Sequence, residues 1–157
     1  MLSTSFYKDK LTNYIKAGNH SCSPQLLAEL AHSEVDRIRI RVAENPRTPL
    51  EILEILAADK NADVRIAVGT NPSTPEHIRF GLAFDADPNV RLGLADDMNT
   101  PMELLEKLTE DTNPYVSCRA AQTKEYIGEQ AQANPFGCHR FFRRTSMGMD
   151  QPELKYA

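Results

Sequence analysis

The chain has 157 residues, a formal net charge of −4 and a hydrophobic fraction of 41%. No apolar run approaches the roughly 20 residues that cross a bilayer. The start, Met1 to Lys10, lacks the basic residues and apolar stretch of a secretory signal, so we expect a soluble, cytoplasmic chain with one cooperative domain. Its three cysteines lie far apart and favour reduced thiols over a disulfide framework. The negative charge disfavours non-specific nucleic-acid binding by the whole molecule.

The chain begins with a predicted amphipathic helix from about Ser3 to Ala17. Its apolar residues recur at three- and four-residue steps, which places them on one helix face: Phe6, Tyr7, Leu11, Tyr14 and Ile15. Gly18 and Asn19 then give a common signal for a helix C-terminus. We expect this helix to cap the first of the units that follow.

Matching residues then return at intervals of 26. The matching pairs are Ile38-Arg39, Val64-Arg65 and Val90-Arg91, and likewise Thr48-Pro49, Thr74-Pro75 and Thr100-Pro101. A fixed period of this length indicates stacked supersecondary units, none of which buries its apolar face alone. Each unit has about the length of one helix pair, so the period predicts an all-helical stack.

The first helix of each unit is predicted to begin at a hydroxyl residue followed by proline. These starts are Ser23-Pro24, Thr48-Pro49, Thr74-Pro75 and Thr100-Pro101, and the first unit is one residue shorter than the others. We expect the hydroxyl to accept a hydrogen bond from a backbone N–H, while proline at the first helical position loses no bond. Glu51 and Glu103 have the offset of a capping box.

The second helix of each unit carries an apolar face with a small residue in its middle. Val64, Ala67 and Val68 form this face in one unit, and Val90, Gly93 and Leu94 form it in the next. Asn-Pro pairs at 45–46 and 71–72 end two of these helices. Cys118 falls at a core-like position of the last unit. The period is lost after residue 125, although residues 126–133 are expected to extend the last helix.

The pattern T-P-x-x-x-L-x-x-L-A-x-D-x-x-x-x-V-R-x-x-V-x-x-N-P, read from Thr48 to Pro72, resembles the leucine-rich repeat variant family and, more distantly, HEAT-like repeats. The resemblance covers Ser23 to Lys124. It implies a right-handed α-solenoid of about four helix pairs, with second helices that are either 3₁₀ or α, and a binding scaffold without a shared reaction. Some family members hold an iron–sulfur centre in an N-terminal cysteine cluster, but here only Cys22 precedes the repeats. We therefore predict a capping helix (1–22), the repeats (23–124), and a C-terminal cap with an irregular tail (125–157).

Aspartates and arginines recur with the same period. They are Asp59, Asp85 and Asp111, and Arg39, Arg65 and Arg91. We interpret them as a structural ladder between units, similar to the Asp/Arg ladder of HEAT-like proteins, in which a shielded charge-assisted bond contributes roughly 1.5–3 kcal/mol. The alternative is acid–base or metal chemistry. Residues 85–89 begin a calcium-loop pattern, but Val90 stands where that loop needs glycine and Asp96 where it needs glutamate.

No other constellation predicts chemistry. His20 with Cys22, and Cys138 with His139, lack the four-ligand spacing of a zinc site and an acidic group that would orient a nucleophile. The glycines form no phosphate-binding loop. We therefore predict no catalytic residue, no metal and no cofactor, and we expect that the protein is not an enzyme.

Two features are candidates for binding. The second helices carry Arg39, Arg41, Arg65, Arg91 and Arg119, which define a potential basic groove for an acidic peptide or nucleic acid, although the ladder uses Arg39, Arg65 and Arg91. The second candidate is the segment 136–147, which has no acidic residue and contains Arg140, Phe141, Phe142, Arg143 and Arg144. Its phenylalanines either cover the open end of the last unit or bind a protein, RNA or an anionic membrane. We expect residues 147–157 to be poorly ordered.

The sequence thus predicts a non-catalytic repeat scaffold that binds a protein partner. Binding would use the stacked helix surface or the basic-aromatic C-terminal segment. The alternative is nucleic-acid or other polyanion binding through the arginines of the second helices. The sequence leaves the partner's identity and the oligomeric state open.

Overall fold

The computed structural model describes residues 3–133, and within them the side chains of residues 9–130. All regular secondary structure in this part of the chain is α-helical, as predicted. The helices are α1 (Ser3–Ala17), α2 (Pro24–Ala31), α3 (Asp36–Ala43), α4 (Leu50–Ala57), α5 (Ala62–Thr70), α6 (Glu76–Leu82), α7 (Pro88–Asp96), α8 (Met102–Thr109) and α9 (Pro114–Ala133). The expected second helices are α rather than 3₁₀. Residues 140–144 and the expected tail lie outside the described residues.

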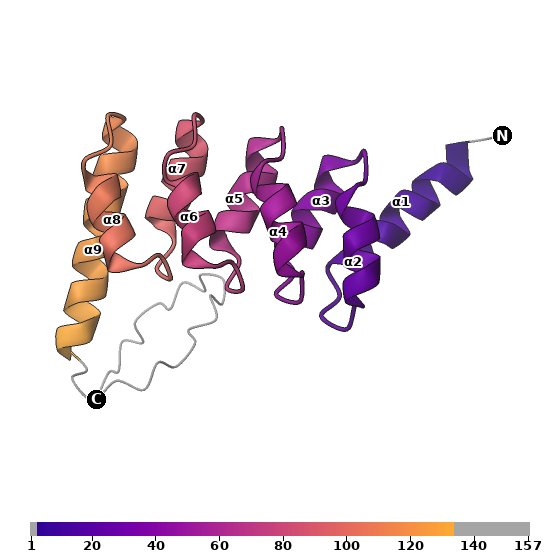
Figure 1. Ribbon diagram of the computed structural model, residues 1–157, viewed down its shortest axis with the longest axis horizontal. Coiled ribbons are helices and arrows are strands. Elements are labelled where there is room, and N and C mark those ends of the chain that lie inside the picture. The colour runs from indigo at the N-terminus through magenta and orange to yellow at the C-terminus, as the bar shows by residue number, and fades with distance from the viewer. Residues whose placement is uncertain (1–2, 134–157) are drawn as a thin grey trace, which may run out of the picture.

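Odd- and even-numbered helices have different neighbours (Figure 1). The odd-numbered helices contact one another in chain order, α1 with α3, α3 with α5, α5 with α7 and α7 with α9. Each even-numbered helix packs against the odd-numbered helix that follows it, and α4 also contacts α2 and α6. Figure 1 shows the helices following one another along the long axis of the picture, so that helices distant in sequence lie far apart.

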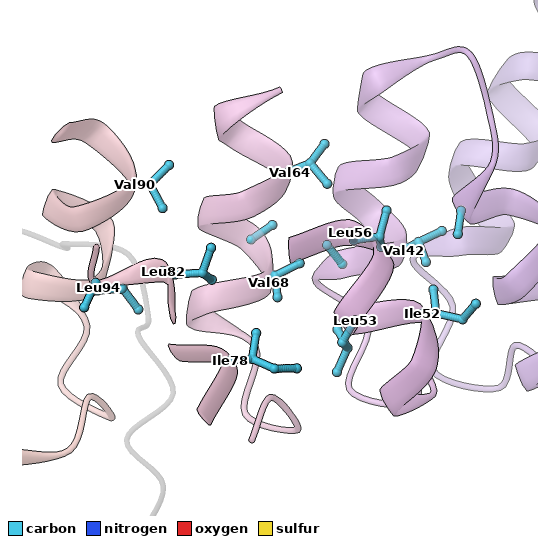
Figure 2. Packing of buried hydrophobic residues seen from close by; sticks show 14 of the residues in the cluster. Val42, Ile52, Leu53, Leu56, Val64, Val68, Ile78, Leu82, Val90 and Leu94 are labelled. Atoms are coloured by element: carbon cyan, nitrogen blue, oxygen red, sulfur yellow. The ribbon is translucent and has the colours of Figure 1, made fainter. Parts of the chain in front are cut away.

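A continuous apolar core lies between the odd- and even-numbered helices (Figure 2). The odd helices contribute Val64, Val68, Val90 and Leu94, and the even helices contribute Leu53, Leu56, Ile78 and Leu82. These residues stand at three- and four-residue steps, which is the spacing that brings side chains to one face of a helix. The predicted burial of the repeated apolar positions is therefore confirmed for α4 to α7.

The predicted caps of the first helices are wrong for three of the four starts. Helices α4, α6 and α8 have proline at the N-cap and no side-chain cap bond. The preceding threonine is buried, and its hydroxyl donates to a carbonyl of the previous helix: Thr48 to Val42 (2.6 Å), Thr74 to Val68 (2.7 Å) and Thr100 to Leu94 (2.8 Å). Those carbonyls lie at helix C-termini, where the backbone has no further partner within the helix. Only Ser23 caps as predicted, accepting from the Leu26 N–H.

The 26-residue register begins earlier than the sequence pattern indicates. Cys22 is buried at the position equivalent to Thr48, and its N–H donates to the Asn19 carbonyl as the Thr48 N–H donates to Asn45. Ser23 therefore corresponds to Pro49, and the first unit is not one residue shorter. By the same offset, the C-terminal end of α1 corresponds to the ends of α3 and α5, and Ala17 is buried like Ala43.

The described side chains of the apolar stripe of α1 are largely exposed. Leu11 and Ile15 are 61% and 62% exposed, and Tyr14 is 36% exposed. Helix α1 contacts α2 and α3, and the carbonyl of its last residue, Ala17, accepts a hydrogen bond from Asn45. Tyr14 lies against Arg41 of α3, whereas the side chains of Phe6 and Tyr7 lie outside the described residues.

Candidate functional site

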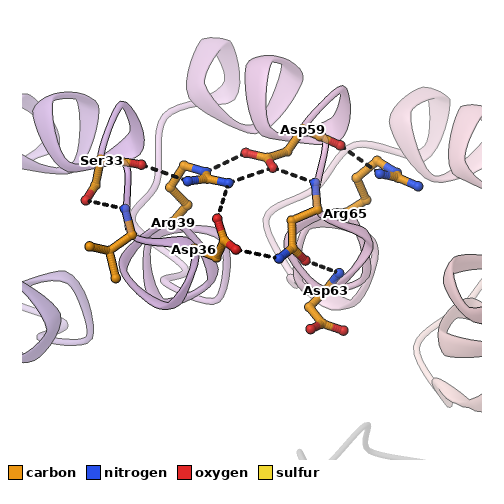
Figure 3. Close-up of polar contacts among 8 residues, drawn as sticks. Ser33, Asp36, Arg39, Asp59, Asp63 and Arg65 are labelled. Carbon is orange, nitrogen blue, oxygen red and sulfur yellow. Dashed lines mark hydrogen bonds and ion pairs between the residues drawn. The ribbon is translucent and has the colours of Figure 1, made fainter.

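The aspartates and arginines of the ladder form bidentate ion pairs between consecutive units (Figure 3). Arg39 Nε donates to Asp59 Oδ2, Arg65 Nε to Asp85 Oδ2, and Arg91 Nε to Asp111 Oδ2, each at 2.6 Å. In each pair Nη2 donates to the second carboxylate oxygen at 2.9–3.0 Å. The third guanidinium nitrogen, Nη1, donates to the carbonyl of the residue six positions before the arginine. Each arginine thus links its own helix to the loop that precedes it and to the equivalent loop of the next unit.

The ion pairs are largely shielded from water. The side chains of Arg65 and Asp85 are 16% and 10% exposed. Hydrogen bonds from Arg65 and Arg91 hold the pKa of Asp85 and Asp111 below the ordinary value, against an opposing effect of burial. For Asp59, burial alone would raise the pKa, but the Arg39 bond and the Asn61 N–H bring it below the ordinary value. These carboxylates are therefore ionised at neutral pH and serve as hydrogen-bond acceptors.

The ladder has a defined beginning and end. The residue 26 positions before Asp59 is Ser33, whose Oγ accepts from the Val35 N–H as Asp59 accepts from Asn61. The residue 26 positions after Arg91 is Ser117, whose hydroxyl donates to the Pro114 carbonyl. A neutral serine thus stands at each position where a charged residue would lack its counterpart.

A second set of contacts between units was not recognised from the sequence. The Asn45 amide donates to the carbonyls of Ala17 (2.8 Å) and Asn19 (3.1 Å), and the Asn71 amide donates to those of Ala43 (2.5 Å) and Asn45 (3.0 Å). Both amides are buried. The Asn-Pro pairs indicated only helix ends. Any residue before proline could end a helix, so a helix end alone does not require asparagine. The recurrence of asparagine itself every 26 residues is the sequence signal for these bonds between units.

The asparagine contacts change where the third member of the series is Asp97. A carboxylate cannot donate as an amide does, and Asp97 Oδ2 is buried without a hydrogen-bond partner among the described residues. The Asn71 carbonyl is bonded instead by Arg79 Nη2 (2.8 Å), while Arg79 Nη1 donates to the Asn99 carbonyl (3.0 Å). Arg79 is 6% exposed at a position where the other units have leucine. Two departures from the repeat therefore occur side by side.

The arginines of the odd helices do not form an unpaired basic row. Arg39, Arg65 and Arg91 belong to the ladder. Arg41 pairs with Glu44 at 2.8 Å and lies over the Tyr14 ring, 5.1 Å from its centroid. Arg119 lies 3.5 Å from Asp96. Because each of these five guanidinium groups has a carboxylate beside it, this geometry gives little support to a polyanion groove. The exposed Arg37 of α3 was not among the predicted five.

The other residues weighed as metal or catalytic groups have separate structural positions. Asp85 is bonded to Arg65, and Asp87 caps α7 by accepting from the Asn89 N–H at 2.8 Å. Cys22 is buried in the core, whereas Cys118 is exposed on α9, so its expected core position is wrong. Cys118 occupies the odd-helix position at which Ile66 and Leu92 stand in the preceding units, and both of those residues are only partly buried. Cys138 and His139 lie outside the described residues.

The even-numbered helices present an exposed apolar surface next to two hollows. Phe84, just after α6, is 75% exposed, and Ile55 on α4 is 50% exposed. A hollow of about 340 Å³ between α4 and α6 is lined by buried Ile78 and Leu82 together with Gly81 and Glu54. A second hollow, of about 430 Å³, lies between the end of α6 and α8 and is lined by Phe84, Leu108, Lys107 and Glu110 among others. We call Gly81, Phe84 and these two hollows the α6 surface.

Charge is divided unequally between the two sets of helices. The even helices α2, α4, α6 and α8 carry six exposed glutamates: Glu29, Glu51, Glu54, Glu76, Glu103 and Glu106. Their basic residues are Lys107, which is exposed, and Arg79, which is buried. The odd helices from α3 to α9 carry seven arginines and lysines against five acidic residues. Around the α6 surface, Glu54 and Glu110 line the hollows together with Lys107, and α4, α6 and α8 add the exposed Glu51, Glu76, Glu103 and Glu106, so acidic side chains outnumber lysine and arginine there.

Comparison with known proteins gives no relative. No family model matches the chain, and neither a curated protein nor a solved structure matches it. Among residues 3–133, no helix has the length and apolar character needed to cross a membrane.

Proposed function

We propose that this chain is an α-solenoid of the leucine-rich repeat variant type and serves as a non-catalytic scaffold that binds a protein partner. The recurrence of the ion pairs and of the asparagine bonds every 26 residues supports stacked, equivalent units. In such a stack, neighbouring units use most of the buried charge to hold one another. The side chains that remain for recognition lie on the outer faces of the helices.

The observation that carries this proposal is the exposure of Phe84, which lines one of the two hollows and is followed by Asp85, which lines both. A large aromatic side chain that is 75% exposed contributes little to the fold, and aromatic residues in such positions are enriched at the centres of protein interfaces. The two hollows beside it offer apolar contacts to a partner's side chains. The basic-aromatic segment at 140–144 is a second candidate for binding, and it lies outside the described residues.

A pull-down from the native host tests the proposal. The tagged full-length chain is compared with Phe84→Ser and with Tyr115→Ser, a control of matched exposure because Tyr115 is 78% exposed in the first turn of α9 and lines neither hollow. We expect a stoichiometric protein partner that Tyr115→Ser retains and Phe84→Ser loses. A variant truncated after Ala133 tests whether the C-terminal segment is also needed.

The same experiment can contradict the proposal. Retention of every partner by both Phe84→Ser and the truncated variant would exclude both candidate surfaces. Loss of the partner after nuclease treatment, together with a steep decrease of binding with salt, would favour the nucleic-acid alternative instead.

A further inference from the structure

The charges around the α6 surface identify the chemistry that would complement it. Three charged residues that line its hollows, Asp85, Arg91 and Asp111, already belong to ion pairs of the ladder. Outside the ladder, α4, α6 and α8 carry five exposed glutamates against one exposed lysine, Lys107, although Glu106 already bonds to Lys124 at 2.9 Å and Glu54 lies 3.9 Å from His77. A partner that desolvates this surface therefore meets negative charge and would be stabilised by basic side chains.

The apolar centre of the same surface adds a second requirement. Phe84 lines one hollow and is followed by Asp85, which lines both, and Ile78, Leu82 and Leu108 reach the hollows from the core. Gly81 leaves this region open, since a Cβ atom built on it would meet no heavy atom within 4 Å. Apolar side chains of a partner could thus lie against Phe84 and enter the hollows without displacing the helices.

We propose that the α6 surface binds a peptide or helix of a protein partner in which lysine or arginine residues alternate with large apolar residues. This inference rests on the proposed scaffold function and names the chemistry of its partner. The apolar side chains occupy the hollows beside Phe84, and the basic side chains lie against glutamates of α4, α6 and α8. An amphipathic basic helix bound in a groove is a common form of peptide recognition.

The test measures binding of a fluorescent synthetic peptide, made of lysine and leucine in the order of an amphipathic helix, to the full-length chain. A glutamate–leucine peptide and a lysine–serine peptide of equal length serve as matched probes. We expect the lysine–leucine peptide to bind with an affinity that decreases with salt, and the other two to bind at least about tenfold more weakly.

Two pairs of variants locate the binding. Phe84→Ser removes the central aromatic side chain, and Gly81→Trp places a large side chain in the open region; each should weaken binding about tenfold or more. Tyr115→Ser and Gly128→Trp are the matched controls, because Tyr115 is equally exposed and a Cβ atom at Gly128 also meets nothing within 4 Å. Circular dichroism and melting curves establish that all four variants fold.

Three outcomes would overturn the inference. Equal affinity of the wild type, Phe84→Ser and Gly81→Trp would place the peptide elsewhere, and equal binding of the glutamate–leucine peptide would exclude the role of charge. A dimer in analytical ultracentrifugation that Phe84→Ser dissociates would make a second copy the occupant. A tenfold gain in peptide affinity on replacing Arg140, Arg143 and Arg144 with serine would make the chain's own segment the occupant.

These outcomes are distinguishable from failure of the scaffold function. If the host partner is lost on Phe84→Ser but the lysine–leucine peptide does not bind, the scaffold function stands and the assigned chemistry is wrong. If neither the host partner nor the peptide depends on Phe84, the proposal that this surface is a binding site fails as well.

Discussion

Replacing Asp85 with alanine should destabilise the fold substantially. The Asp85 carboxylate accepts three hydrogen bonds, from Arg65 Nε (2.6 Å), Arg65 Nη2 (2.9 Å) and the Asp87 N–H (2.8 Å). Its side chain is 10% exposed, so the variant leaves the Arg65 guanidinium with one remaining bond in a largely water-excluded position. Charged hydrogen bonds of this kind, together with the cost of an unpaired shielded charge, give an expected loss of about 2–4 kcal/mol.

Differential scanning calorimetry and urea unfolding measure this loss. For a chain of this size about 1 kcal/mol lowers Tm by roughly 2–4 °C, so we expect a decrease of roughly 5–15 °C. Asp85→Asn keeps an acceptor for the Asp87 N–H and should lose less. Asp63→Ala removes an exposed carboxylate from the first turn of α5, where its interaction with the helix dipole contributes about 1 kcal/mol or less.

A double-mutant cycle with Arg65→Met separates the pair from other effects. The double variant should lose less stability than the sum of the single variants, with a coupling of roughly 1–3 kcal/mol. An unchanged melting temperature for Asp85→Ala, or strict additivity with Arg65→Met, would refute the conclusion that the ladder holds consecutive units together.

Three further predictions concern pH, packing and the interrupted asparagine series. Because the ladder aspartates have a lowered pKa in the folded state, their stabilisation is complete above the ordinary value of 3.8 and is lost as pH falls through the lower folded-state values. Melting curves against pH should therefore decline below about pH 4, and less steeply in Asp85→Asn; equal slopes would contradict this. Gly69→Ala should destabilise the chain by about 1–3 kcal/mol, since a Cβ atom there comes within 2.9 Å of the buried Leu94 side chain. Gly128→Ala should instead stabilise the chain by about 0.5–1 kcal/mol, because a Cβ atom there meets nothing within 4 Å. Urea midpoints that shift in the same direction for both variants would contradict this packing argument. Asp97→Asn restores an amide donor and should raise stability by about 1 kcal/mol, so a lower urea midpoint would show that the carboxylate is itself stabilised.

The repeated features of the fold were accessible from the sequence because each is signalled several times. The apolar steps in Val64, Ala67 and Val68 recur in the neighbouring units, and burial follows them. The Asp and Arg positions likewise recur with one offset, and Arg65 lies beside Asp85. A residue type that returns at the same position in several units predicts its structural role better than a single residue does.

Features that depend on the orientation of a side chain or a helix, rather than on residue spacing, could not be predicted from the sequence. The Thr48 hydroxyl could accept from its own helix or donate to the previous one, and only the packing of the loop decides between them. The stripe containing Leu11 predicts an amphipathic helix but not which side meets α3. Arg79 in a leucine position carries no signal of the carbonyls it bonds, because Asn71 and Asn99 come close only in the folded chain.

The serines at the two ends of the ladder bear on how the length of this protein could change. Duplicating residues 65–90 would give each new arginine an aspartate at the correct offset of 20 residues, so an internal copy would arrive with its electrostatic contacts already complete. Adding a copy beyond Ser117, or before Ser33, would instead leave a charge opposite a neutral hydroxyl. Inserting or deleting a whole 26-residue unit within the ladder therefore preserves the ion pairs, whereas adding a unit at either end does not. Longer variants are best engineered by inserting copies inside the ladder.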